Sequence, residues 1–376
     1  MTAVMEMSAK ELVDGLGPVF ADRAARRDGS DAFVAENYAQ MREAKLFSAM
    51  APRELGGGGM RYSEMCWLVR EMSHYCGSTA LALSMHQHLV AAAVLNHGQG
   101  RPGEKLLRMV AGGGKVLVST GGSDWLTSSG RLERCEGGYR FTARKSFASG
   151  CQAGDVLVTS GQLDGGEAGK QVLHFSVPMN AEGVRIERDW EAMGMRGTGS
   201  HSVMLEGVFI PEAAISVRRP YGRYHPLWNV TLTVALPLIA SVYVGLAEAA
   251  AEMARTSAAA KGDDGVRSIL MGEVENELTV ARMALESMVA NADELRSEVN
   301  LEHANRALVR KTIAVEASVR TAEKALEVVG GRGYYRAAGL ERVLRDIHAG
   351  QFHPLQTKHQ QRFTGRVAMG LEPVEA

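Results

Sequence analysis

Five histidines stand in two short stretches where they could carry out acid–base or metal chemistry. His86 and His88 lie in a largely apolar stretch, and His348, His353 and His359 lie near the C-terminus. A neutral imidazole can gain or lose a proton near neutral pH, so each is a candidate proton carrier. A metal site is disfavoured, because no carboxylate or Cys joins the C-terminal histidines at helical spacing. The apolar surroundings of the first pair are more typical of packed histidines than of catalytic ones.

Polar turns rich in glycine and serine are the second group of residues that could bind a ligand or take part in a reaction. Glycine lets a backbone approach a pyrophosphate closely, which residues 330–334 could do, although a helix C-cap would explain them equally well. Residues 194–199 superficially resemble a dinucleotide fingerprint, but they lead into a strand-like run instead of a helix, so that interpretation is disfavoured. The turns of this kind are residues 121–124, 145–150, 196–200 and 330–334.

The secondary structure that must position these residues changes twice along the chain, from helical to β-type and back to helical. Residues 1–112 and 223–376 have helical patterns. Between them, residues 113–222 hold short β-type runs, and 19 of the 42 glycines lie between residues 101 and 200. Strands separated by turns, without helices between them, predict an antiparallel sheet or a small barrel. The six runs are residues 116–119, 139–144, 156–160, 172–177, 184–187 and 203–210.

The sequence therefore predicts an α+β protein that is mostly α-helical and has three domains. They are an N-terminal α-helical domain (1–112), a central antiparallel β-barrel-like domain (113–222) and a C-terminal helical bundle (223–376). In the last of these, apolar residues recur at alternating steps of four and three, which predicts one buried face of a long helix. These residues are Val274, Leu278, Ala281, Leu285, Met288 and Ala292.

Charge and composition disfavour several kinds of partner. The 376-residue chain has a formal net charge of -1 and no block of like charge, so nucleic acid and anionic membranes are poor partner predictions. Val230–Ala247 has no charge and is about as long as a membrane span, but Pro237 interrupts it and Glu248 follows it. We therefore expect a buried core helix there. Four cysteines without CxxC spacing, and no secretory signal, favour a cytoplasmic protein.

Taken in order, these segments resemble those of the acyl-CoA dehydrogenase superfamily of flavoproteins. Residues 193–211, MGMRGTGSHSVMLEGVFIP, are similar to the family segment that ends in a Val-x-(Val/Ile)-Pro strand. Residues 121–124 resemble the end of its Ala-Gly-Ser-Asp turn, and residues 145–150 resemble its Lys-x-aromatic-x-(Ser/Thr)-(Asn/Gly) strand. Residues 330–334 resemble its Gly-Gly-x-Gly-aromatic loop, and Arg345-Asp346 matches the pair that precedes the active-site loop.

The resemblance implies a fold, a cofactor and an assembly. It implies that the C-terminal domain is a four-helix bundle, that the protein is a homotetramer, and that FAD lies between the β domain and the bundle, completed by a neighbouring subunit. Phe147 would lie against the isoalloxazine ring, and Ser149 would hydrogen-bond it. The further cofactor-binding residues that it implies are Ser123, Arg196, Gly330, Gly331 and Gly333.

The chain departs from the family at the catalytic base and near the cofactor. A dehydrogenase of this kind needs a carboxylate to remove the α-proton of the thioester. Most members carry a Glu eight residues after the Arg-Asp pair, where this chain has Pro354, and the alternative position near Ala235 also has no carboxylate. Arg255 is not followed by the family's Phe-Gly pair, and Glu327 replaces a Gln near the diphosphate. FMN is therefore an alternative to FAD.

Two enzyme functions follow from the resemblance. The first, which its breadth favours, is α,β-dehydrogenation of an acyl-CoA or related thioester, with hydride transfer to flavin N5, His353 as replacement base and a separate electron-transfer partner. The second is a reduced-flavin-dependent monooxygenase supplied by a flavin reductase, in which oxygen reacts at flavin C4a. His86, Ser149 and His353 would then be the polar groups at the flavin edge. The missing Glu suits the second function, and a catalytically silent flavin-binding protein is a third hypothesis.

Overall fold

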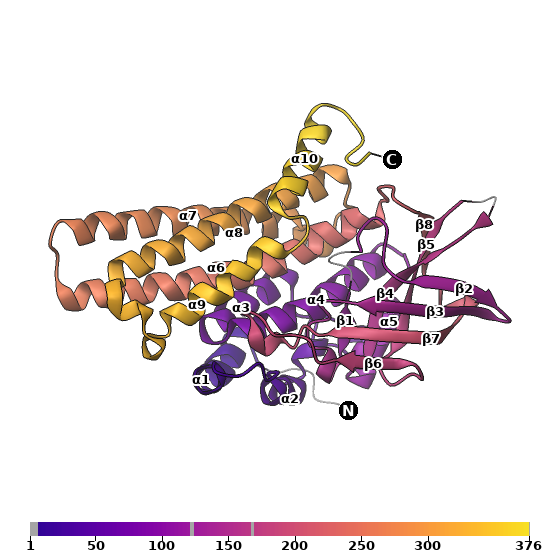
Figure 1. Ribbon diagram of the computed structural model, residues 1–376, viewed down its shortest axis with the longest axis horizontal. Coiled ribbons are helices and arrows are strands. Elements are labelled where there is room, and N and C mark those ends of the chain that lie inside the picture. Colours follow the sequence, from indigo (N-terminus) through magenta and orange to yellow (C-terminus); the bar gives the residue numbers. More distant parts are fainter. Residues whose placement is uncertain (1–6, 121–123, 167–168, 376) are drawn as a thin grey trace.

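The computed structural model describes residues 7–120, 124–166 and 169–375, which form a mostly helical protein with one sheet (Figure 1). The prediction of an N-terminal helical segment is confirmed. The helices before the sheet are α1 (Ala9–Arg27), α2 (Ala35–Glu43), α3 (Tyr62–Tyr75), α4 (Gly77–Gly98) and α5 (Glu104–Gly113).

These N-terminal helices share one hydrophobic core with the long helix α6 (Leu227–Lys261). The hydroxyl of Tyr62 donates to the carbonyl oxygen of Val234 at 2.7 Å. A Cβ atom at Gly245 would lie 2.1 Å from the carbonyl oxygen of Arg70, so α3 and α6 approach so closely that only glycine fits. The most apolar windows of α4 and α6 are 83% and 94% buried inside the protein. Burial in this core explains why both helices are apolar enough to span a membrane.

The described residues form a sheet of eight strands: β1 (Leu117–Ser119), β2 (Arg131–Cys135), β3 (Gly138–Lys145), β4 (Val156–Leu163), β5 (Gln171–Pro178), β6 (Val184–Glu187), β7 (Ser202–Pro211) and β8 (Val217–Pro220). This sheet corrects the predicted antiparallel barrel in two respects. Strands β1 and β2 both run parallel to β4, whereas the other pairs are antiparallel. Residues 146–155 connect β3 to β4 without a tight hairpin, and this longer connection lets β4 run in the direction of β2. Within the described residues, the end strands β6 and β8 do not pair, so the sheet is mixed and open.

The strands follow the order β6-β7-β3-β2-β4-β5-β8, with β1 beside β4. Their inward-facing side chains form a second hydrophobic core, separate from that of the helices.

Long helices follow the sheet and extend away from it (Figure 1). After α6, the helices are α7 (Val266–Asn291), α8 (Leu301–Val329), α9 (Leu340–Ile347) and α10 (Thr357–Ala368). The apolar face predicted for residues 274–292 is buried. Helix α8 ends at Val329, where Gly330 adopts a φ of 70°, which supports the predicted C-cap. The short helix α9 packs against α6 and α8.

Candidate active site

The loop that follows α9 brings His353 against α6. Its Nε2 atom lies 2.6 Å from the hydroxyl oxygen of Tyr243, and the centroids of the two rings are 5.5 Å apart. Tyr243 is fully buried, and His353 is partly buried. Pro354 follows directly, so the position at which the family places its base holds no carboxylate. The sequence pattern pointed to His353 but not to Tyr243, which lies in the uncharged stretch of α6 and faces His353.

Both members of this pair are neutral at neutral pH. Burial, together with Lys311 and His88 nearby, lowers the pKa of His353 to about 3. Burial also raises the pKa of Tyr243 well above its usual value. A phenol that donates its hydrogen to Nε2 leaves the ring hydrogen of His353 on Nδ1. An imidazole with this pKa is too weak a base to remove the α-proton of a thioester.

The two histidines of α4 have different surroundings. His86 is buried, and its Nδ1 accepts from the backbone N–H of Leu117 at 2.9 Å while its Nε2 donates to the carbonyl oxygen of Phe47 at 2.8 Å. Because both ring nitrogens are used, the structure gives no support to the prediction that His86 faces the flavin edge. His88 is also buried, and its Nδ1 has no hydrogen-bond partner in the described residues.

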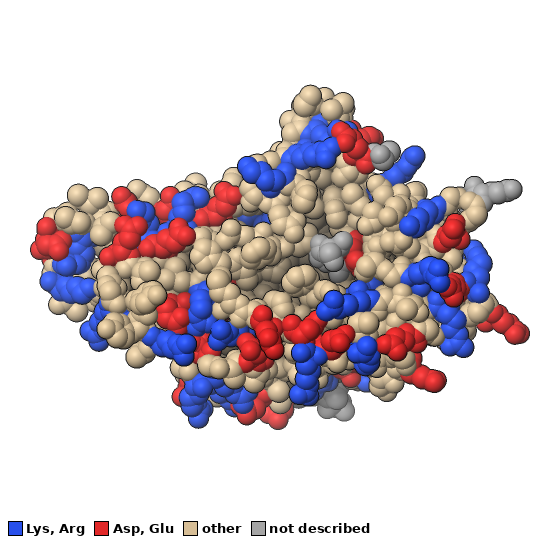
Figure 2. Space-filling model, in the orientation of Figure 1, with Lys and Arg blue, Asp and Glu red and all other residues tan. Residues whose placement is uncertain are grey.

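Phe147 offers an exposed aromatic wall. Its side chain is 59% exposed, and its backbone has a φ of 59°, a left-handed conformation that is unfavourable for a residue with a bulky side chain. The ring of Trp190 lies beside it, 6.1 Å away between centroids. Strained residues of this kind gather at ligand sites, and Figure 2 shows a hollow with few charges between the C-terminal helices and the sheet. An exposed phenyl ring on a strained turn fits the planar flavin that the resemblance implies.

A buried ion pair anchors the start of this turn. The Nζ atom of Lys145 pairs with the carboxylate of Asp124 and donates to the carbonyl oxygen of Ser129 at 2.7 Å. Lys145 and Asp124 are both buried, so the pair fixes residue 124 beside the turn that carries Phe147. Ser123, which was predicted to bind the cofactor, lies outside the described residues.

Hydroxyl groups anchor the other end of the turn. The Oγ atom of Ser149 lies 2.7 Å from that of Ser200, and Ser200 Oγ lies 2.7 Å from Thr198 Oγ1. The backbone N–H of Gly150 also donates to the carbonyl oxygen of Thr198 at 2.9 Å. The structure therefore brings together two turns that the sequence analysis identified separately, residues 145–150 and 196–200.

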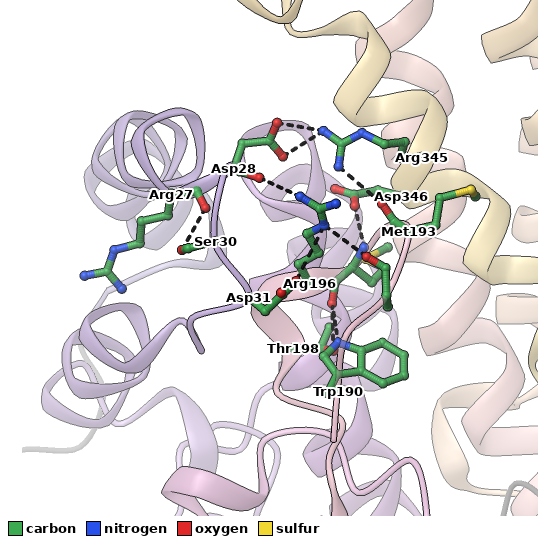
Figure 3. A network of polar contacts seen from close by, with 12 residues as sticks. Arg27, Asp28, Ser30, Asp31, Trp190, Met193, Arg196, Thr198, Arg345 and Asp346 are labelled. Carbon is green, nitrogen blue, oxygen red and sulfur yellow. Dashed lines mark hydrogen bonds and ion pairs between the residues drawn. The ribbon is translucent and has the colours of Figure 1, made fainter. Parts of the chain in front are cut away.

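Arg196 is directed at the N-terminal segment (Figure 3). Its Nη1 donates to the carbonyl oxygen of Asp28 at 3.0 Å, and its Nε donates to that of Ala192 at 3.0 Å and lies 3.6 Å from the carboxylate of Asp31. These contacts use Nε and Nη1 and direct the guanidinium towards the N-terminal segment, so the binding of a cofactor by Arg196 stays a prediction. Its role is to fix the turn before β7 to the N-terminal helices.

Arg345 and Asp346 strengthen the same junction (Figure 3). The Nη2 atom of Arg345 donates to both carboxylate oxygens of Asp28, at 2.8 and 2.6 Å. The carboxylate of Asp346 accepts from the backbone N–H of Met195 at 2.5 Å, and burial raises its pKa to about 6. The Arg-Asp pair thus joins α9 to two distant segments of the chain.

Replacing Arg345 by methionine is expected to lower the free energy of unfolding by about 2 kcal/mol, because it leaves the mostly buried Asp28 carboxylate without its charged donor. Chemical denaturation at neutral pH measures this loss. Arg26→Met is the matched control, since Arg26 pairs with Asp22 on the exposed surface of α1 and should change stability by less than about 0.5 kcal/mol. Equal effects of the two substitutions would show that the Asp28 junction is not a stabilising contact.

The glycine loop after α8 lies at the end of the long helices farthest from the sheet (Figure 1). A Cβ atom at Gly330 or Gly331 would meet no atom within 4 Å, whereas Gly333 packs against Leu326. Within one chain, this loop and the sheet thus lie at opposite ends of the long helices (Figure 1). Contact between these glycines and a flavin would therefore need a second subunit, and that assignment stays a prediction.

Glu327 and Arg255, the two charged residues of the C-terminal helices at which the chain differs from the family pattern, form local ion pairs. The carboxylate of Glu327 lies 3.0 Å from Lys324, so a neighbouring cation balances its charge. Arg255 pairs with Glu275 at 2.7 Å and with Glu252 at 3.0 Å. Lys324 thus offsets the charge of Glu327, and two carboxylates offset the charge of Arg255.

One cluster has the ligand spacing of a metal site, but it is already balanced in charge. Ligand atoms of Glu71, His74 and Glu248 lie within 4.8 Å of one another. Arg282 and Arg70 contact the Glu248 carboxylate at 2.6 and 3.5 Å, and the pKa of Glu248 falls to about 2 although its burial opposes this. Two guanidinium groups therefore occupy the place of a metal cation and join α3, α6 and α7.

The sequence matches known family models on both sides of the sheet. Residues 6–114 match the acyl-CoA dehydrogenase N-terminal domain, and residues 238–357 match the acyl-CoA dehydrogenase C-terminal domain.

Similar curated proteins include both oxygenases and dehydrogenases. The chain is 27% identical over 349 residues to the amino sugar nitrososynthase DnmZ of Streptomyces peucetius, covering 88% of this chain and 85% of the relative. It is 26% identical over 362 residues to a dibenzothiophene monooxygenase of Mycolicibacterium goodii, covering 87% and 85%. It is also 27% identical over 370 residues to the putative acyl-CoA dehydrogenase YdbM of Bacillus subtilis, covering 92% of each chain.

Solved structures share the fold across almost the whole chain. KijD3, in complex with FMN and a dTDP-amino-keto sugar, superimposes with a TM-score of 0.86 at 23% identity, covering 96% of this chain and 93% of the other. XiaF from Streptomyces sp., in complex with FADH2 and glycerol, gives a TM-score of 0.84 at 21% identity, covering 98% and 96%. At these identities the likeness concerns the fold. Together with the two family models, it establishes that this chain belongs to the acyl-CoA dehydrogenase superfamily of flavin-dependent enzymes.

Proposed function

We propose that this protein is a flavin-dependent monooxygenase that receives reduced FMN or FAD from a separate reductase and oxidises a small molecule other than an acyl-CoA. The observation that carries the proposal is the neutral Tyr243–His353 pair, which stands where a dehydrogenase of this family needs a carboxylate. The geometry therefore favours the second of the two functions that the sequence suggested. The similarity to a dibenzothiophene monooxygenase, and the fold shared with FMN- and FADH2-bound proteins, add support.

The carboxylate of Asp346 does not supply the missing base. It acts on Tyr243 electrostatically and has a pKa of about 6, which would suit a base. However, it is buried and already accepts the backbone N–H of Met195, so its charge is used to hold the turn before β7. Dehydrogenation of a thioester would thus have to depend on an imidazole with a pKa of about 3.

The residues of this chain have separate tasks in the proposed reaction. Phe147 would cover one face of the flavin, and Ser149 would hydrogen-bond it. The bound reduced flavin would supply the two electrons with which O2 places one oxygen atom in the substrate and releases the other as water. His353 would donate from Nδ1 to an oxygen atom that gains negative charge, while Tyr243 holds the imidazole in that tautomer through Nε2.

Anaerobic mixing with acyl-CoA esters tests the proposal. The flavin-loaded protein is expected to keep its visible absorbance with every ester in a panel of short, long and branched chains, because no base removes the α-proton. In the presence of oxygen, protein loaded with reduced flavin should release hydrogen peroxide more slowly than free reduced flavin does. Bleaching by any acyl-CoA at a catalytic rate would overturn the proposal in favour of the dehydrogenase.

A further inference from the structure

A directed chain of hydrogen bonds ends at Ser149. The Oγ1 atom of Thr198 donates to the carbonyl oxygen of Met195 at 2.8 Å, and a carbonyl oxygen can only accept. Since Thr198 has a single hydroxyl hydrogen, Ser200 must donate in the 2.7 Å contact between Thr198 and Ser200. By the same count, Ser149 must donate in the 2.7 Å contact between Ser200 and Ser149.

Ser149 therefore offers only lone pairs to a ligand. Its one hydroxyl hydrogen is used inside the chain, and the two other hydroxyl residues are buried, with exposures of 0% for Thr198 and 6% for Ser200. Ser149 itself is partly exposed, and its backbone N–H donates to the carbonyl oxygen of Phe147 at 3.0 Å. The acceptor thus stands on the same tight turn as the exposed phenyl ring.

We propose that this chain of hydroxyl groups makes Ser149 a hydrogen-bond acceptor that selects reduced flavin over oxidised flavin. The inference rests on the proposed function, because a flavin must bind at this turn with its N5 edge towards Ser149. A reduced isoalloxazine ring carries an N–H at N5, where the oxidised ring has a bare nitrogen that can only accept. Lone pairs on Ser149 attract the first group and repel the second. A protein that takes reduced flavin from a reductase benefits from this preference, because the oxidised flavin then leaves more easily.

The dissociation constants of oxidised and reduced FMN and FAD, measured without oxygen by equilibrium ultrafiltration, test the inference. We expect the wild-type protein to bind the reduced form about tenfold more tightly. Ser200→Ala removes the acceptor of the Ser149 hydrogen, so Ser149 can turn that hydrogen towards oxidised N5. The ratio of the two constants should then fall by about three- to tenfold, the effect of one hydrogen bond.

Two further variants keep the test decisive. Thr198→Val also breaks the chain, because Ser200 loses its acceptor and can donate to Ser149, and the ratio should fall in the same way even if Ser200→Ala does not fold. Ser202→Ala is the matched control, since Ser202 is buried on the same segment but its hydroxyl donates to Ser146 at 3.3 Å, outside the chain. Its ratio should equal that of the wild type.

The outcomes separate the inference from the proposed function. A folded wild-type protein that binds neither form of FMN or FAD would contradict the proposed function itself. Equal affinity of the wild type for both forms, or a ratio that stays unchanged when the chain is broken, would overturn the role of Ser149 and leave the monooxygenase proposal standing. A ratio that falls in the chain-breaking variants and not in Ser202→Ala supports the inference.

Discussion

Replacing His353 by alanine is expected to lower the rate of product formation by about 100-fold or more, while reduced flavin still binds. In the proposed reaction His353 would donate its Nδ1 hydrogen to the reacting oxygen, because Tyr243 lies 2.6 Å from Nε2. Turnover of the substrate and affinity for reduced flavin are measured on the same preparation. Oxygen should still be consumed, and a larger share of it should appear as hydrogen peroxide.

Two variants serve as comparisons for this substitution. Tyr243→Phe leaves the imidazole in place but removes the hydrogen bond that favours one of its two tautomers. We therefore expect a smaller loss of turnover, about tenfold. His359→Ala removes an exposed histidine from the next helix and should leave turnover unchanged. Unchanged turnover in His353→Ala would return this histidine to a purely structural role in the loop.

Acid is expected to unfold the protein steeply below about pH 6.5, because four histidines are held neutral by burial. Their pKa values fall from 6.5 to about 4 or about 3 in the folded state. Between those values and 6.5, the unfolded chain binds protons that the folded chain excludes, so stability is lost as the pH falls. The shift at the fully buried His86 alone corresponds to about 3 kcal/mol. The four residues are His86, His88, His174 and His353.

Urea denaturation between pH 7.5 and 4.5 measures this slope. His86→Gln should flatten it, although it also lowers stability at neutral pH because two backbone contacts are lost. His359→Gln, at an exposed position, should leave it unchanged. Asp346 works in the opposite direction, because its raised pKa of about 6 adds stability as the pH falls from 6 towards 4, so Asp346→Asn should steepen the slope. Stability that is constant from pH 7 to pH 5 would contradict the neutral state of the buried histidines.

The sequence predicted the helical segments better than the sheet. The apolar stripe of α7 is a local pattern, and packing buries it as expected. Strand β2 was missed because Arg131–Cys135 is mostly charged and exposed, and it is a strand only because β3 pairs with it. The parallel pairing of β2 with β4 was also missed, since no local signal shows where the chain crosses between β3 and β4.

The candidate site was predicted only where spacing along the chain defines it. His353 was found by counting from the Arg-Asp pair. His86 and His88 lie two residues apart and so point to different faces of α4, but that helix is buried almost all round and offers no polar face to orient them. The sequence around Lys311 holds a signal that could have predicted a residue of the candidate site. Lys311 lies in the buried stripe of α8 between Leu308 and Val315, where a lone charged side chain indicates a specific polar partner. In the structure its Nζ donates to the carbonyl oxygens of His353 and Leu355.

The shared core of α4 and α6 has a consequence for how the protein is made. A ribosome must complete the entire sheet after α4 emerges before α6 becomes available to cover it. During that interval the apolar surface of α4, from Gly77 to Gly98, has no partner, which is the condition under which nascent chains aggregate or engage chaperones. The N-terminal helices therefore complete their packing only after most of the chain has been synthesised. A fragment that stops at the end of the sheet lacks α6 and cannot complete this hydrophobic core.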